Sequence, residues 1–216
     1  MKKILGLAVA ALLIMGLVGG GTWAYFSDTE TTSSNVLTAG TIDLEFDSGV
    51  TTPFSLGPVK PGDNVSAAVN WELENQGTID GYLYITFGSL TKGENGFEDA
   101  ETAVGDSDAD GELGERVKIA VWIDTDDNGW DTGDKYLSSS GSVVDYVSGS
   151  LVPTAAFDVI NNFDGDSWSS IDSIAATTGT ANFKVEYDWA DAGSNADNDA
   201  MGDTCQFDIT FELRQS

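Results

Sequence analysis

The chain has 216 residues, with 36 Asp and Glu against nine Lys and Arg, for a formal net charge of −27. So acidic a surface repels phosphate backbones and anionic lipids, which argues against nucleic acid and anionic membranes as partners. It favours divalent cations, or high salt that screens the self-repulsion. The chain has no His and one Cys, which excludes HExxH zinc motifs, Ser-His-Asp triads and an internal disulfide.

The N-terminus has the pattern of a secretory signal peptide. Lys2 and Lys3 precede an apolar run over residues 4–18, and Thr22-Trp23-Ala24 places small residues at the −3 and −1 positions of a cleavage site. We expect residues 1–24 to be removed after Ala24, so that Tyr25 becomes the N-terminus. The alternative is an uncleaved membrane anchor, but the run is shorter than the ~20 residues that span a bilayer. The mature chain is therefore expected to have no membrane span.

Apolar residues alternate along several short segments of the remaining chain, which predicts β-strands. The expected strands cover residues 36–46, 65–73, 81–87, 117–123, 183–189 and 204–213. Short helices are expected around 97–104 and 168–176. Many short strands between turn signals, without a sustained helical period, predict that residues 36–216 form an all-β sandwich with few short helices and long acidic loops. Cys205 falls on the apolar face of the last strand, so we expect a buried structural thiol, with a reactive or intermolecular thiol as the alternative.

Two acidic loops, at 106–115 and 124–134, resemble the opening half of a calcium loop. In both, Asp or Asn occupies the first, third and fifth positions and Gly the sixth, so that oxygen ligands converge around a sharp turn. The candidate ligands of the first loop are Asp106, Asp108 and Asp110, with Glu115 as a late carboxylate. Those of the second loop are Asp124, Asp126 and Asn128, with Asp131 or Asp134 completing the shell.

Neither loop is an EF-hand, because neither has Glu at the twelfth position or two flanking helices. The second loop also fits a β-hairpin, since Asn128-Gly129 is a hairpin turn signal. A solvated acidic turn without metal therefore stays open for both loops. A weaker acidic cluster lies near the C-terminus, at Asp197, Asn198, Asp199 and Asp203.

The segment GGGTWAYFSDTE at 19–30, followed by LTAGTIDL at 37–44, resembles the N-terminal signature of the TasA/camelysin family. Three later segments fit in the same order, at 56–63, 71–77 and 207–215, so the resemblance runs from end to end. It implies that the sandwich is a jelly roll and that a SipW-type signal peptidase processes the leader. It also implies a secreted protein that forms filaments at the cell surface, like the archaeal bundling pili and cannulae.

The resemblance further implies that the mature N-terminal arm, residues 25–35, adds as a donor strand to the next subunit. An extended peptide can complete an open sheet edge, and a head-to-tail contact of this kind gives an open homopolymer. The alternative is a disordered N-terminal tail. The candidate donor residues are Tyr25, Phe26, Ser27, Asp28, Thr29, Glu30, Thr31 and Thr32.

Two other functions remain as alternatives. A monomeric calcium-binding surface adhesin or carbohydrate-binding module would use exposed Trp, for which Trp130 and Trp168, beside acidic turns, are the candidates. A camelysin-like peptidase is implied by the relatives described as metallopeptidases, but the chain has no His, and carboxylate clusters are poor zinc sites. A glycosidase with paired carboxylates also stays open. We assign no catalytic residues and expect no enzymatic activity.

Overall fold

The computed structural model describes residues 40–46, 59–94, 99–105, 111–191 and 195–215. The expected cleavage site at Ala24 and Tyr25, the arm 25–35, and Asp106, Asp108 and Asp110 lie outside these residues. The strands are β1 (Leu44–Phe46), β2 (Asn64–Asn75), β3 (Gly81–Phe87), β4 (Thr91–Gly93), β5 (Lys118–Asp124), β6 (Lys135–Leu137), β7 (Val143–Asp145), β8 (Asp158–Val159), β9 (Ser167–Trp168), β10 (Ser173–Ile174), β11 (Gly179–Asp188), β12 (Thr204–Gln206) and β13 (Ile209–Arg214). The helices are α2 (Asp99–Val104), α3 (Leu113–Arg116) and the 3₁₀ turns η1 (Thr154–Ala156), η2 (Ile160–Phe163) and η3 (Asn195–Ala200).

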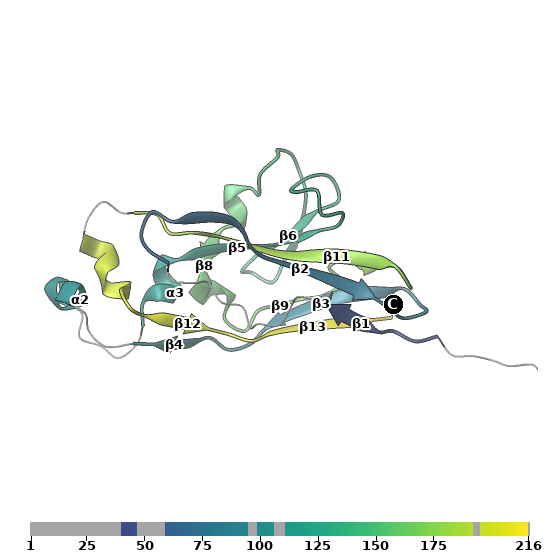
Figure 1. Cartoon of the computed structure of the whole chain (residues 1–216), viewed down its shortest axis with the longest axis horizontal. Coiled ribbons are helices and arrows are strands. Elements are labelled where there is room, and N and C mark those ends of the chain that lie inside the picture. The colour runs from purple at the N-terminus through teal and green to yellow at the C-terminus, as the bar shows by residue number, and fades with distance from the viewer. Residues whose placement is uncertain (1–39, 47–58, 95–98, 106–110, 192–194, 216) are drawn as a thin grey trace, which may run out of the picture. The chain divides into compact units, whose positions relative to one another are not determined.

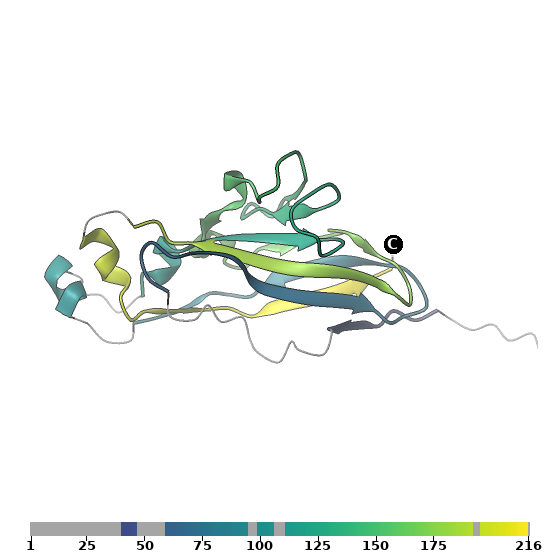
Figure 2. The ribbon, with the colours of Figure 1, turned by 45° about the horizontal axis from the view of Figure 1, so that its top comes forward.

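The strands form antiparallel sheets in a sandwich-like arrangement (Figures 1 and 2). The larger sheet has the order β1-β2-β11-β5-β6-β7, with β8 also paired to β5. The facing sheet has the order β10-β3-β13, with β9 also paired to β3, and β12 pairs with β4 in a small third sheet. The expected all-β sandwich with few short helices is confirmed.

The larger sheet is covered on both faces at β5, as the burial of that strand shows. Ile119, Val121 and Ile123 point into the main core, whereas Ala120 and Trp122 belong to a second apolar cluster on the opposite face. Residues 125–157 contribute the rest of that second cluster, through Trp130, Val152 and Ala156 among others. Because both faces are covered, six consecutive residues of β5 are buried and no polar alternation is needed.

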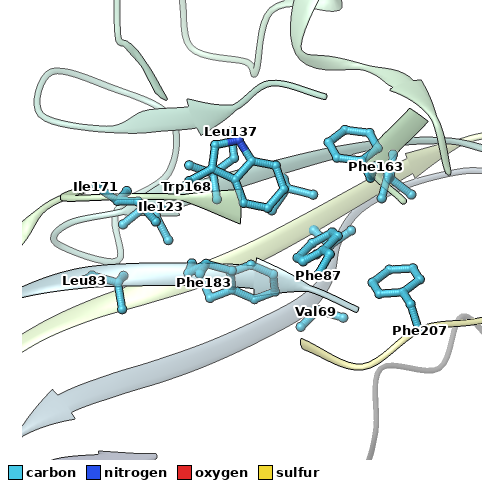
Figure 3. Close-up of a cluster of buried hydrophobic side chains, with 14 of the residues drawn as sticks. Val69, Leu83, Phe87, Ile123, Leu137, Phe163, Trp168, Ile171, Phe183 and Phe207 are labelled. Carbon is cyan, nitrogen blue, oxygen red and sulfur yellow. The ribbon is translucent and has the colours of Figure 1, made fainter. Parts of the chain in front are cut away.

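The main core lies between the two larger sheets and is built around aromatic rings (Figure 3). Phe87 of β3 stacks on Phe207 with 4.8 Å between ring centroids and meets Trp168 edge-on at 5.1 Å. Phe183 of β11 is fully buried and packs edge-on against Phe211 of β13 at 5.0 Å. These rings connect β3, β11 and β13 across the sandwich.

Two sequence predictions were wrong in detail. Residues 168–176 are not a helix, because β9 and β10 pair with β3 there and the Ile171 N–H donates to the Leu83 carbonyl. The expected strand 204–213 is broken near Phe207, since β12 pairs with β4 and β13 pairs with β3.

Cys205 on β12 is half-buried, and burial raises the pKa of its thiol to about 11, which agrees with a structural thiol. The helix expected around 97–104 is confirmed as α2.

Replacing Phe183 should destabilise the sandwich more than any exposed aromatic would. Phe183→Ala leaves a cavity between the sheets and should lower the free energy of unfolding by about 3–5 kcal/mol. The matched control is Tyr82→Ala, because Tyr82 lies on β3 with 37% of its surface exposed. Denaturant titration of the two variants measures the difference, and equal losses would contradict the placement of the core.

Candidate functional site

The β5–β6 connection brings acidic side chains of the second predicted loop together. Ile123 pairs with Lys135, so the loop closes a β-hairpin, as the Asn128-Gly129 signal predicted. Asp124, Asp126 and Asp134 each place one carboxylate oxygen within 4.8 Å of the others. Asp124 and Asp134 are fully buried, whereas Asp126 is exposed. Such a group can hold a metal ion, and its all-oxygen donor set suits a hard cation.

Backbone donors and one lysine surround the two buried carboxylates. The Asp124 carboxylate accepts bonds from the Asp126 N–H at 3.2 Å, from the Gly129 N–H at 3.0 Å and from Lys184 Nζ at 2.8 Å. Lys184 comes from β11 and also reaches Asp127 at 2.8 Å. The Lys184 ammonium therefore places a positive charge at the base of the loop, which the sequence pattern did not reveal.

The other candidate ligands of this loop, Asn128 and Asp131, donate hydrogen bonds to Asp126 and Asp134. The Asp134 carboxylate accepts the Thr125 N–H at 3.0 Å and the Asp131 N–H at 2.8 Å. Asn128 donates through its side-chain amide to Asp126 at 2.8 Å. Asp131 thus reaches the group through its backbone in this structure.

The two buried carboxylates of the loop differ in pKa. Burial alone would raise the pKa of Asp124, but the Lys184 ammonium and the backbone N–H groups hold it below its usual value. Burial raises the pKa of Asp134 against its backbone donors, and the Asp124 and Asp131 carboxylates raise it further. As the pH falls, Asp134 should protonate first, and the stability that ionised Asp124 contributes should be lost only as the pH passes through its lowered pKa. A divalent cation would favour the ionised form of Asp134.

A second carboxylate group lies at the end of the small β4–β12 sheet. Glu94, Glu101 and Asp203 place oxygens within 4.8 Å of one another, from the end of β4, from α2 and from the residue before β12. Glu101 and Asp203 are buried. The sequence pattern pointed only to Asp203, as part of the weaker C-terminal cluster, because Asp203 is far in the chain from Glu94 and Glu101 and the three give no local pattern.

The second half of the first predicted loop reaches this second group. The Glu112 N–H donates to the Asp203 carboxylate at 2.6 Å. Gly111 approaches so closely that a Cβ there would lie 2.8 Å from the Gly93 carbonyl oxygen. Glu115, in contrast, is exposed and accepts bonds from Lys92 at 3.3 Å and Asn161 at 3.2 Å, so it belongs to neither carboxylate group.

Both tryptophans predicted to lie at the surface are buried. Trp130 is 5% exposed and Trp168 is 1% exposed, and the Trp168 indole N–H donates to the Ser138 carbonyl. Their place beside acidic turns in the sequence was misleading, because each ring packs under its turn into an apolar cluster. Neither residue offers a stacking surface to a sugar.

A family model described as camelysin metallo-endopeptidase matches residues 1–216. The chain belongs to the camelysin metallo-endopeptidase family. This confirms the resemblance based on the N-terminal signature and the later segments. The chain is also 39% identical over 80 residues to the major biofilm matrix component of Bacillus subtilis (strain 168). That alignment covers 37% of this chain and 29% of the relative, which is less than a third of the relative's length.

The donor set does not fit the zinc centre that the words metallo-endopeptidase suggest. Catalytic zinc in proteins is held by His, Cys or a mixed set with His, and the full sequence has no His and a single Cys. Both groups of candidate ligands in the described residues consist of carboxylates alone. Oxygen ligands of this kind suit calcium or another hard cation. In the described ranges, no helix is long and apolar enough to cross a membrane.

Removing the Lys184 ammonium should destabilise the hairpin strongly. In Lys184→Met the buried Asp124 carboxylate loses its counter-charge, so the free energy of unfolding should fall by about 3 kcal/mol. Lys135→Met is the control, because the Lys135–Asp172 pair is more exposed and should contribute about 1 kcal/mol or less. Denaturant titration compares the variants, and a Lys184 loss no larger than the Lys135 loss would contradict the electrostatic role of Lys184.

Proposed function

We propose that the chain is a structural subunit of an extracellular filament at the cell surface. The observation that carries this is the similarity to the major biofilm matrix component, within a family match that covers the whole chain. The all-β sandwich supports it, because such a body presents strand edges to neighbours. On this proposal the main partner of the chain is a second copy of itself.

The assembly step that we propose is donation of residues 25–35 to the next subunit. A SipW-type signal peptidase would cut after Ala24 and free Tyr25. Until that cut the arm is held at the membrane by the leader and cannot insert elsewhere, so cleavage would act as the assembly switch. Because the contact is head-to-tail and does not close, it gives an open fibre.

Deleting residues 25–35 from the mature protein should abolish filaments and leave a soluble monomer. The body is expected to keep its core, because the main core of the described chain is built from residues after position 40. Electron micrographs and sedimentation of the two forms at equal concentration measure the effect. Filaments of normal abundance from the deleted form would contradict the proposal, whereas circular dichroism checks that the deleted form is folded.

We further propose that calcium stabilises the subunit through the acidic groups. The groups are Asp124, Asp126 and Asp134, and Glu94, Glu101 and Asp203. Asp106, Asp108 and Asp110 are further candidate ligands from the sequence pattern alone. Carboxylate oxygens held this close repel one another, and a bound cation offsets the repulsion by binding only the folded state.

Millimolar calcium should therefore raise the melting temperature, and EDTA should lower it. Asp134→Asn and Glu101→Gln should each reduce the calcium response, since each removes charge from one group. Thermal melts at matched ionic strength make the comparison, with magnesium as a control for general screening. Identical melting temperatures in calcium and in EDTA would contradict the calcium proposal and leave the filament proposal intact.

A peptidase is the second candidate, because the family description names that activity. The donor set described above argues against a zinc mechanism. A casein turnover assay on purified protein, with and without added zinc, separates the two candidates. Turnover by the purified chain would favour the peptidase, and a monomeric species that binds glycans would favour an adhesin instead.

A further inference from the structure

β13 is an edge strand of the smaller sheet. It pairs with β3 from Ile209 opposite Phe87 to Arg214 opposite Tyr82. No other strand of the described residues pairs with it. At six residues, β13 is longer than the outer strands of the larger sheet, β1 and β7, which have three residues each. A long edge strand of this kind is a template for an added strand.

The pairing of β3 shows which backbone groups of β13 face outward. The Leu83 N–H donates to the Asp172 carbonyl, and the Leu83 carbonyl accepts from the Ile171 N–H. The backbone groups of the odd-numbered residues of β3 therefore face the β9 and β10 side. The even-numbered residues of β3 therefore face β13, because backbone groups alternate in direction along a strand.

The even-numbered partners on β13 face back toward β3. The backbone N–H and C=O groups that point away from the sheet then belong to the odd-numbered residues Ile209, Phe211 and Leu213. The side chains of the same three residues pack against the core, while Thr210, Glu212 and Arg214 are exposed.

An apolar surface lies directly beside these outward backbone groups. Phe211 packs against Phe46 of β1 at 5.4 Å and Trp71 of β2 at 6.1 Å, and behind it against Phe183. Exposure rises across this aromatic cluster from 0% at Phe183 to 41% at Phe46. Figures 1 and 2 show β1 beside β13, so the cluster lies between the edges of the two sheets. A strand added along β13 would form hydrogen bonds with the outward backbone groups of β13. The same strand would also cover the exposed Phe46 ring.

We propose that the β13 edge with this aromatic cluster accepts residues 25–35 of the neighbouring subunit, an inference that rests on the proposed filament function. In an extended arm, Tyr25, Ser27, Thr29 and Thr31 share one face. The opposite face carries Phe26 with Asp28 and Glu30, and burying these two carboxylates without partners would be costly. The arm therefore turns its Tyr25 face to the cluster and keeps both carboxylates in solvent.

The point where the described chain begins also fits a neighbour as the acceptor. The Thr41 carbonyl accepts the N–H groups of Thr78 and Ile79, so the chain enters the sandwich beside the turn after β2. On the proposal, the arm that precedes this point in the sequence joins the β13 edge of a second copy. A head-to-tail contact then repeats with the same two surfaces in every subunit.

Cysteine cross-linking in the full mature chain tests the acceptor. In a Cys205→Ala background, Asp28→Cys or Glu30→Cys is combined with Glu212→Cys, since all three side chains lie on the outer face. The two arm positions cover neighbouring registers, because a disulfide needs Cα atoms within about 7 Å. The matched control replaces Glu212→Cys by Asp145→Cys, which is exposed on the outer strand β7 of the other sheet.

With oxidised glutathione, one of the Glu212→Cys pairs should give a ladder of dimers, trimers and larger species on a non-reducing gel, and reduction should collapse it. The Asp145→Cys pairs should stay monomeric on the same gel. Filaments that form normally but cross-link only through Asp145→Cys, or through neither site, would overturn this acceptor edge and leave the filament proposal standing. Filaments that survive deletion of residues 25–35 would instead overturn the donor arm itself.

Discussion

β11 holds the two halves of the larger sheet together, because in the described chain it joins β2 to β5. Its side chains serve the two faces differently. Phe183 enters the main core, whereas Lys184 on the opposite face lies 5.3 Å from the Trp122 ring and reaches Asp124. The packing of the sandwich and the neutralisation of the acidic hairpin are therefore set by neighbouring residues of one strand. A shift of β11 by one residue would exchange these roles and bury the ammonium in the apolar core.

The excess of acidic residues sets the second constraint on the structure. With nine Lys and Arg for 36 Asp and Glu, most carboxylates cannot have a cationic partner. The buried Asp134 is held by backbone N–H groups, and the buried Asp124 by backbone N–H groups and Lys184. The half-buried Asp199 accepts hydrogen bonds from Arg116 through both carboxylate oxygens. The Glu94 group lies where β4 and α2, which are consecutive in the chain, meet the distant segment before β12, so a cation there would tie α2 to β4 and β12. Charge placement and fold are thus coupled at the ends and on the outer face of the sandwich.

Sequence patterns predicted what depends on neighbouring residues and missed what depends on distant pairing. The strands at 81–87 and 117–123 and the hairpin at 124–134 were predictable, because alternation and turn signals are local. The two short strands within 167–174 exist only because β3 pairs with them, so their own sequence carries too weak a signal. The same reason explains why Lys184 and the Glu94 group were missed, since their partners are contributed by other parts of the chain. Trp130 and Trp168 show the opposite error, because both rings are buried although their neighbours in the sequence are polar.

On the proposed function, the β13 edge would link this fold to assembly, since its outward backbone groups and the exposed Phe46 ring lie together on one side of the sandwich. The proposed assembly depends above all on the arm of one copy completing the sheet of the next. A cryo-electron microscopy map of the filament at side-chain resolution tests that claim most directly. We expect a strand beside β13 that traces to Tyr25 of the neighbouring copy. A β13 edge without an added strand, or one covered by the arm of its own chain, would contradict it.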